Sequence, residues 1–262
     1  MSKLGDKIRK ARRLESGAIG FGAITARPRV PSMLLMVHGP AEMMRPAGEL
    51  AERGVDAILQ SLSRPQEEMG NLARWAKEAG DVPWGAQVAA ASSNTVAGLK
   101  EAGADFLAFD AEDTAAEALL ETEMGYVLAI SGEPADTFLR VLETLPLEGL
   151  WLYDWQGPLT VRRQMELRRL HLLSRTPLFV PVQPDIDPAA LECLRDAGVV
   201  AVAMSCTDAS KWQQLADLRQ AIDGLPPRPR RREERPEAVL PLGRESAPQA
   251  EEEEEEEVFP PE

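Results

Sequence analysis

Short apolar runs alternate with longer, more polar segments from residue 33 to residue 224. The runs are five to seven residues long, which is typical of buried parallel strands. They are "MLLMVH" (33–38), "DAILQS" (56–61), "PWGAQV" (83–88), "DFLAFD" (105–110), "YVLAIS" (126–131), "LWLYD" (150–154), "PLFVPV" (177–182) and "VVAVAMS" (199–205).

The segments between these runs have the length and start signals of helices, such as Asp187 before Pro188. They predict helices at 41–53, 65–79, 93–102, 113–123, 134–145, 159–174, 187–197 and 208–223.

One short phrase recurs three times, as "ERGVDAILQ" (52–60), "EAGADFLAF" (101–109) and "DAGVVAVAM" (196–204). In each copy a polar helix end precedes a glycine, and an apolar run follows it. The glycines Gly54, Gly103 and Gly198 therefore predict left-handed caps that end a helix and lead into a strand. The repetition indicates a chain built from βα units.

Eight strands that alternate with eight helices predict a (β/α)8 TIM barrel over residues 33–224. A doubly wound open sheet is the alternative, but no glycine-rich phosphate turn follows the first strand. Residues 1–32 are predicted to form a basic N-terminal extension, a helix plus a short strand that covers the barrel as a lid. In another register, residues 18–24 would instead be a barrel strand.

The composition changes at residue 225, where proline, blocks of charge and a run of seven glutamates begin to dominate. Such a segment buries too little apolar surface to offset its ordering entropy, so residues 225–262 are predicted to be a disordered acidic tail. The tail is either a solubilising appendage or a docking segment for a protein partner.

Charge and cysteine content exclude several classes of protein. The formal net charge of −14 argues against a nucleic-acid partner, because phosphates would be repelled. No apolar run is long enough for a membrane helix, so no membrane association is expected. The two cysteines are too few for a disulfide framework, and they favour a cytoplasmic location.

In a TIM barrel the active site lies at the carboxyl ends of the strands. The predicted strands end with polar residues, which we expect to meet there around a small-molecule ligand. Even-numbered strands contribute Ser61, Asp110, Asp154 and Ser205, and odd-numbered strands contribute His38, Gln87 and Gln183.

Asp110 and Asp154 are the candidate catalytic pair, since two neighbouring carboxylates can divide the roles of acid and base. They are also candidate ligands for a divalent metal such as Mg²⁺. The alternative is that they point outward and either cap the following helices or bind loop amides, and one residue of strand register decides between these readings. His38 is either a proton carrier or a structural residue, whereas the serines and glutamines above would bind substrate.

The segment "IDPAALECLRDAGVVAVAMS" (186–205) resembles the closing quarter of aldolase-type TIM barrels that bind phosphate or FMN. The resemblance implies this barrel fold. It also implies a phosphate-binding site formed by glycines that follow the last two strands. Here those positions read "VQPDID" (182–187) and "MSCTDAS" (204–210), so FMN is expected less than a metal.

Together these features favour a lyase or isomerase that acts on a small polar metabolite through paired carboxylates. One alternative is a non-catalytic barrel that serves as a scaffold or regulatory partner through its acidic tail. Another is a flavin-dependent oxidoreductase.

Overall fold

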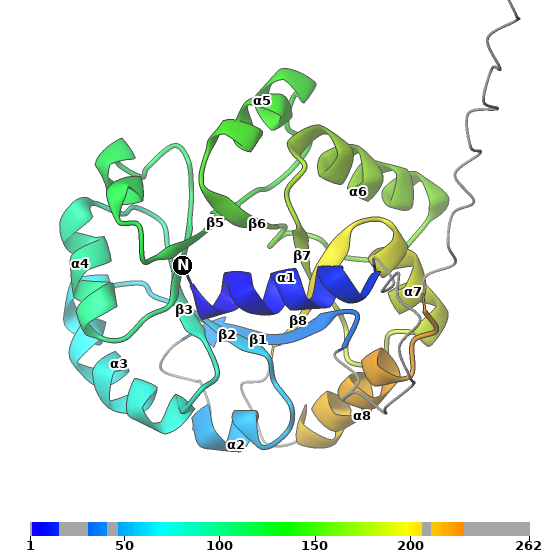
Figure 1. Cartoon of the computed structure of the whole chain (residues 1–262), viewed down its shortest axis with the longest axis horizontal. Helices are drawn as coiled ribbons and strands as arrows, with labels where there is room; N and C mark the ends of the chain where they lie inside the picture. The colour runs from blue at the N-terminus through cyan, green and yellow to red at the C-terminus, as the bar shows by residue number, and fades with distance from the viewer. Residues whose placement is uncertain (1, 16–30, 41–46, 206–210, 228–262) are drawn as a thin grey trace, which may run out of the picture. The chain divides into compact units, whose positions relative to one another are not determined.

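The computed structural model, which describes residues 2–15, 31–40, 47–205 and 211–227, shows a closed barrel of eight parallel strands (Figure 1). The ring closes where β8 pairs with β1, with Leu34 opposite Ala201 and His38 opposite Ser205. The predicted (β/α)8 TIM-barrel fold is confirmed. The strands are β1 (Leu34–Pro40), β2 (Ala57–Ser61), β3 (Trp84–Val88), β4 (Phe106–Phe109), β5 (Gly125–Ala129), β6 (Leu147–Trp151), β7 (Leu178–Pro181) and β8 (Val199–Ser205).

A helical segment follows each strand and covers the outside of the barrel (Figure 1). The helix predicted at 113–123 is reduced to one short 3-10 segment, and the one at 134–145 is split in two. The segments are α2 (Ala47–Ala51), α3 (Pro65–Ala79), α4 (Ser93–Glu101), η2 (Ala116–Leu120), α5 (Asp136–Val141), η3 (Leu142–Thr144), α6 (Val161–Ser174), α7 (Pro188–Asp196) and α8 (Trp212–Asp223).

The three glycines of the recurring phrase all have positive φ, at 75° for Gly54, 89° for Gly103 and 103° for Gly198. Their predicted left-handed conformation is confirmed, and it turns the chain from a helix end into the next strand. At Gly198 a side chain would also clash, because an added Cβ would lie 2.3 Å from Cγ of His171.

β6 lies three residues earlier than the sequence pattern predicts. The pattern favoured 150–154, whereas the strand begins at Leu147, directly after Pro146. The pairing with β5 skips Glu148, since Tyr126 lies opposite Leu147 and Val127 lies opposite Gly149. This β-bulge places a carboxylate inside a strand that was predicted from its apolar residues alone.

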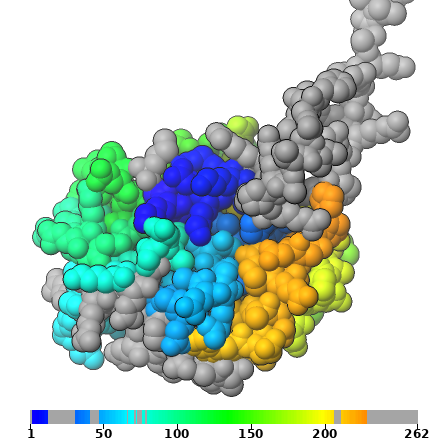
Figure 2. All heavy atoms as spheres, turned by 60° about the horizontal axis from the view of Figure 1, so that its bottom comes forward, coloured from blue at the N-terminus to red at the C-terminus, as the bar shows by residue number. Residues whose placement is uncertain are grey.

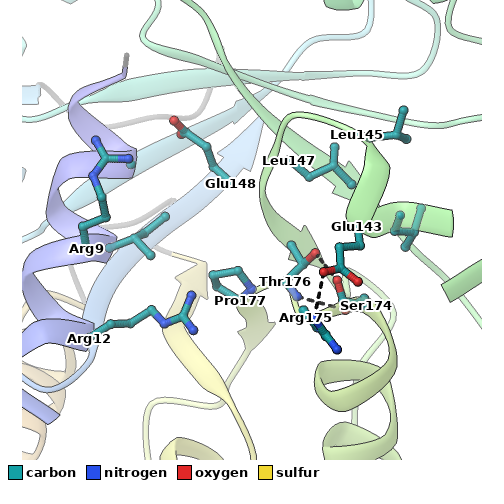
Figure 3. A pocket seen from close by; sticks show the side chains of 13 residues that line it. Arg9, Arg12, Glu143, Leu145, Leu147, Glu148, Ser174, Arg175, Thr176 and Pro177 are labelled. Atoms are coloured by element: carbon teal, nitrogen blue, oxygen red, sulfur yellow. Dashed lines mark hydrogen bonds and ion pairs between the residues drawn. The ribbon is translucent and has the colours of Figure 1, made fainter. Parts of the chain in front are cut away.

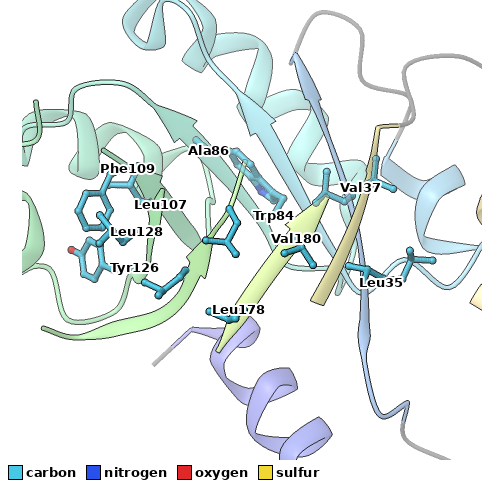
Figure 4. Close-up of a cluster of buried hydrophobic side chains, with 14 of the residues drawn as sticks. Leu35, Val37, Trp84, Ala86, Leu107, Phe109, Tyr126, Leu128, Leu178 and Val180 are labelled. Carbon is cyan, nitrogen blue, oxygen red and sulfur yellow. The ribbon is translucent and has the colours of Figure 1, made fainter. Parts of the chain in front are cut away.

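Large aromatic side chains fill the barrel interior, and glycines on neighbouring strands make room for them. A Cβ at Gly85 would lie 2.4 Å from the Phe106 ring, and one at Gly149 would lie 2.5 Å from the Phe179 ring. A second apolar layer, which includes Trp84 and others in Figure 4, packs between the barrel and its helices. The barrel is therefore a packed core rather than a pore.

The helix α1 (Lys3–Glu15) lies across the amino-terminal end of the barrel (Figure 1), and its atoms form a dark blue patch of surface in Figure 2. Its apolar side chains Leu4, Ile8 and Ala11 belong to the same buried cluster as the barrel interior. The carboxylate of Asp105 accepts hydrogen bonds from the backbone N–H groups of Lys3 (2.7 Å) and Leu4 (2.8 Å). These bonds satisfy amides at the start of α1 that have no partner within the helix.

Several predictions concern residues outside the described ranges. These are the short strand within 17–24, the first part of the helix at 41–53, and the acidic tail from residue 228 onward. Within the described ranges, no helix combines the length and the apolar character that crossing a membrane requires.

Candidate functional site at the carboxyl ends of the strands

A cavity of about 530 Å³ opens at the carboxyl ends of β1, β6, β7 and β8. We call it the upper cavity. The segment 153–159 after β6 and the segment 181–186 after β7 form two of its walls, and α7 contributes to a third. Its polar side chains include His38, Tyr153, Gln183, Ser205 and Lys211.

A linked set of side chains lies at the last inward-facing positions of the strands. The His38 ring meets the Trp151 ring edge-on, with 5.3 Å between centroids. Trp151 Nε1 donates a hydrogen bond to Gln87 Oε1 (3.3 Å), and Ser61 Oγ donates to the same oxygen (3.4 Å). Gln87 and Ser61 therefore hold the Trp151 indole in place within this layer, and His38 connects the layer to the upper cavity.

His38 is neutral at physiological pH. Burial, and secondarily the positive charge of Lys211, lower the pKa of this histidine from 6.5 to about 4. A neutral imidazole has one nitrogen that donates and one that accepts a proton or hydrogen bond. His38 can therefore polarise or deprotonate a bound group, and an anion beside it would raise its pKa again.

One positive charge lines the upper cavity among the residues that the structure describes. Among the described residues that line it, Lys211 carries the one formal charge, and its Nζ donates a hydrogen bond to the backbone oxygen of Ser205 (3.2 Å). Trp155 lines the cavity, and the Arg163 guanidinium lies 4.7 Å from the centre of its ring. Arg163 Nη1 is buried and has no hydrogen-bond partner among the described residues. This arrangement favours an anionic ligand.

The rest of the upper cavity is apolar. Trp155 and Leu159 come from the segment after β6, Val182 and Ile186 from the segment after β7, and Met204 from β8. A mostly apolar wall with a few convergent polar groups is typical of small-molecule sites.

The two predicted carboxylates do not line this cavity within the described chain. Asp110 Oδ1 accepts a hydrogen bond from the backbone N–H of Glu112 (2.9 Å). Asp154 Oδ2 accepts one from the backbone N–H of Gly132 (3.0 Å), which joins the loop after β6 to the loop after β5. Trp151, rather than Asp154, belongs to the interior cluster of β6. These are the loop-amide contacts that the sequence left open as the alternative role.

A metal site would need further ligands. No group of three or more His, Cys, Asp or Glu side chains within the described ranges is placed to hold a metal ion. Asp110 and Asp154 alone would leave most of the coordination shell of a hard cation to water.

Three predicted residues, His38, Gln183 and Ser205, come together in the upper cavity. Lys211 was not predicted, because the predicted site residues all lie at the ends of the predicted strands. The available signal was its position just before α8, at the end of the loop that follows the last strand.

The closed parallel barrel and the cavity at its carboxyl ends define the class: this chain is a (β/α)8 TIM-barrel protein. No protein-family model matches the sequence, and no curated protein matches it.

Solved structures are similar in fold. A tryptophan synthase chain from M. tuberculosis is 13% identical, with a TM-score of 0.60 over 85% of this chain and 97% of that chain. A protein from Aquifex aeolicus VF5 is 11% identical (TM-score 0.58; 85% and 98% covered). The homocysteine methyltransferase MmuM from Escherichia coli is 14% identical (TM-score 0.52; 72% and 95% covered). At these identities the likeness concerns the fold alone.

Proposed function

We propose that this protein is an enzyme of the lyase or isomerase class that acts on a small organic anion bound in the upper cavity. The observation that carries the proposal is the pairing of a neutral histidine, His38, with a cation, Lys211, at the mouth of a TIM barrel. Lyases and isomerases of small metabolites commonly need a positioned proton carrier and a group that holds the substrate charge.

Each residue has a distinct role in this proposal. Lys211 holds the anionic group of the substrate, while Trp155 and the apolar wall contact its carbon skeleton. Gln183 and Ser205 orient its polar groups by hydrogen bonds. His38 takes up a proton from the substrate carbon or returns it, and its pKa rises once the anion is bound, which makes the imidazole a stronger base.

Asp110 and Asp154 support this site indirectly in the same proposal. Their amide contacts, at 2.9 Å and 3.0 Å, hold the loops that follow β4, β5 and β6. The acid–base role that the sequence favoured for them is assigned here to His38.

The proposal is tested by calorimetric titration of Lys211→Gln with a panel of small carboxylates and phosphate esters. We expect the best ligand of the unmodified protein to bind at least about tenfold more weakly, because a charge-assisted contact is lost. Lys77→Gln, a change of the same kind on the exposed surface of α3, is the matched control and should bind normally.

The same titrations in two buffers with different ionisation enthalpies measure proton uptake. Between pH 4 and 6.5, anion binding should take up a proton, and His38→Gln should abolish the uptake. Equal affinity in Lys211→Gln and Lys77→Gln, or proton uptake that survives in His38→Gln, contradicts the proposal.

A further inference from the structure

A second cavity of about 340 Å³ lies at the opposite, amino-terminal end of the barrel. We call it the lower cavity. Figure 3 shows α1 on one side of it, and β6, the end of α6 and the segment that leads into β7 on the other. Its volume is at the small end of the range for ligand sites, which suits a metabolite rather than a polymer.

Three arginines line the lower cavity. Arg9 and Arg12 extend from α1, and Arg175 lies at the end of α6, where its side chain is turned toward Glu143 (Figure 3). Two carboxylates are also present. Glu143 forms an ion pair with Arg175 (3.0 Å), and Glu148 accepts a hydrogen bond from Ser2 Oγ (2.5 Å). The three cations therefore exceed the two carboxylates that line the cavity.

Arg12 is the arginine that is open to a ligand. Arg9 already pairs with Asp6 (2.6 Å), whereas Arg12 makes no hydrogen bond or ion pair with any described residue. Its side chain extends from α1 toward Pro177 (Figure 3). A planar guanidinium in this position can bind a carboxylate or phosphate through two parallel hydrogen bonds.

The backbone of Arg175 is the second independent observation. Arg175 adopts the left-handed conformation (φ 54°, ψ 12°), and it is the one residue other than glycine with positive φ among those described. The ends of other helices in this chain use glycine there, as at Gly54 and Gly103. A residue with a Cβ is disfavoured in this conformation.

The ion pair with Glu143 does not account for this choice of residue. Both partners are largely exposed, at 73% for the Arg175 side chain and 52% for that of Glu143. Exposed pairs contribute little to stability. Arg175 has a backbone conformation that is unfavourable for a residue with a Cβ, and it lies beside a cavity. This combination indicates a role for its guanidinium other than stabilising the fold.

We infer that the lower cavity binds a small organic anion, a phosphate monoester or dicarboxylate with an apolar part, through Arg12 and Arg175. The apolar part would contact Ile8, Leu145 and Pro177. This site is separate from the upper cavity and independent of the proposed function, since the two cavities have no lining residue in common.

Two probes test the site, phenyl phosphate and phenylsuccinate, each a dianion with an apolar ring. Binding is measured by titration of the ¹⁵N-labelled full-length protein, with the amide signals of Ile8 and Thr176 as reporters of the lower cavity. We expect saturable shifts of both signals with at least one probe. A response to one probe alone identifies the phosphate or the dicarboxylate class, and a response to both identifies a general dianion site.

Arg175→Gly is the sharpest variant, because glycine suits the left-handed backbone while the guanidinium is lost. We expect its Tm to rise by about 2–4 °C while the probe binds at least about tenfold more weakly. Arg12→Gln should weaken binding to a similar extent. Lys10→Gln, which removes a charge from α1 away from the cavity, should bind within about twofold of the unmodified protein.

The inference is overturned if neither probe shifts the Ile8 and Thr176 signals. Unchanged affinity in both Arg12→Gln and Arg175→Gly also overturns it. Lys211→Gln separates the two proposals, because it should leave these shifts intact even where it abolishes binding at the upper cavity.

Discussion

The two ends of the barrel each carry a cavity, but they are built from different parts of the fold. At the carboxyl end, strand ends and loops surround a space above the layer of His38 and Trp151. At the amino end, α1 fills the barrel mouth with Leu4 and Ile8, so the lower cavity lies beside this helix. The parallel barrel thus leaves one end available for a central site and closes the other with a helix.

The ionisable groups at the two ends respond to burial in opposite directions. Burial lowers the pKa of His38 at the carboxyl end and raises the pKa of Glu148 at the amino end. Both shifts disfavour the charged form of the group. The two ends should therefore contribute opposite slopes to the pH dependence of stability.

The largest effect on stability is expected from a substitution that weakens the packing of α1 against the amino-terminal end of the barrel. Leu4→Ala removes a side chain that is 1% exposed within the interior cluster, and we expect it to lower the free energy of unfolding by about 2–5 kcal/mol. Urea unfolding followed by circular dichroism measures this loss. Lys10→Ala, on the exposed face of the same helix, should change stability by less than about 0.5 kcal/mol. Equal effects of the two variants would mean that α1 does not contribute to the core.

The next effect concerns His38 and acid. The folded protein keeps this histidine neutral down to a pKa of about 4, whereas the unfolded chain protonates it near 6.5. Its contribution to stability is therefore complete above pH 6.5 and is lost as the pH falls toward 4, by at most about 3 kcal/mol. Urea midpoints measured across this window should fall less steeply in His38→Gln than in the unmodified protein. Parallel curves would show that His38 is not desolvated.

The smallest effect is expected from Glu148, and its sign is reversed. Burial, opposed by the Ser2 hydrogen bond, raises the pKa of this carboxyl above 4.5, so the folded state binds its proton more tightly than the unfolded chain does. Stability from this group is greatest below pH 4.5 and is lost as the pH rises through the raised pKa. Glu148→Gln should therefore be more stable than the unmodified protein at pH 7.

The two proteins should converge in urea midpoint below pH 4.5. Glu143→Gln, at an exposed carboxylate of the same cavity, is the matched control and should shift the midpoint little at either pH. A Glu148→Gln variant that is less stable at pH 7 contradicts this account of the lower cavity.

Local sequence patterns predicted most of the fold, because residues within each βα unit determine where its strand and its helix begin and end. The glycines of the recurring phrase require a left-handed backbone whatever surrounds them, and the apolar runs are buried on both faces of a parallel sheet. β6 was misplaced because its first residues include Glu148 and Gly149. Their places depend on partners elsewhere in the chain, the Ser2 hydroxyl for one and the Phe179 ring for the other.

The candidate site was predicted in part. His38, Gln183 and Ser205 end strands that become neighbours when the ring closes, so their convergence followed from strand order. Asp154 lies beyond the true end of β6, where its carboxylate reaches the amide of Gly132 instead of the cavity. A shift of three residues along a strand is enough to move a side chain away from this cavity.

The sequence by itself determined the order and type of the elements, because hydrophobic period and glycine caps act over a few residues. Only the tertiary structure decided which polar groups share a cavity, which carboxylate is buried, and that Arg12 and Arg175 line the same cavity. Those outcomes depend on ring closure and on bulges, which bring together residues that are far apart in the chain.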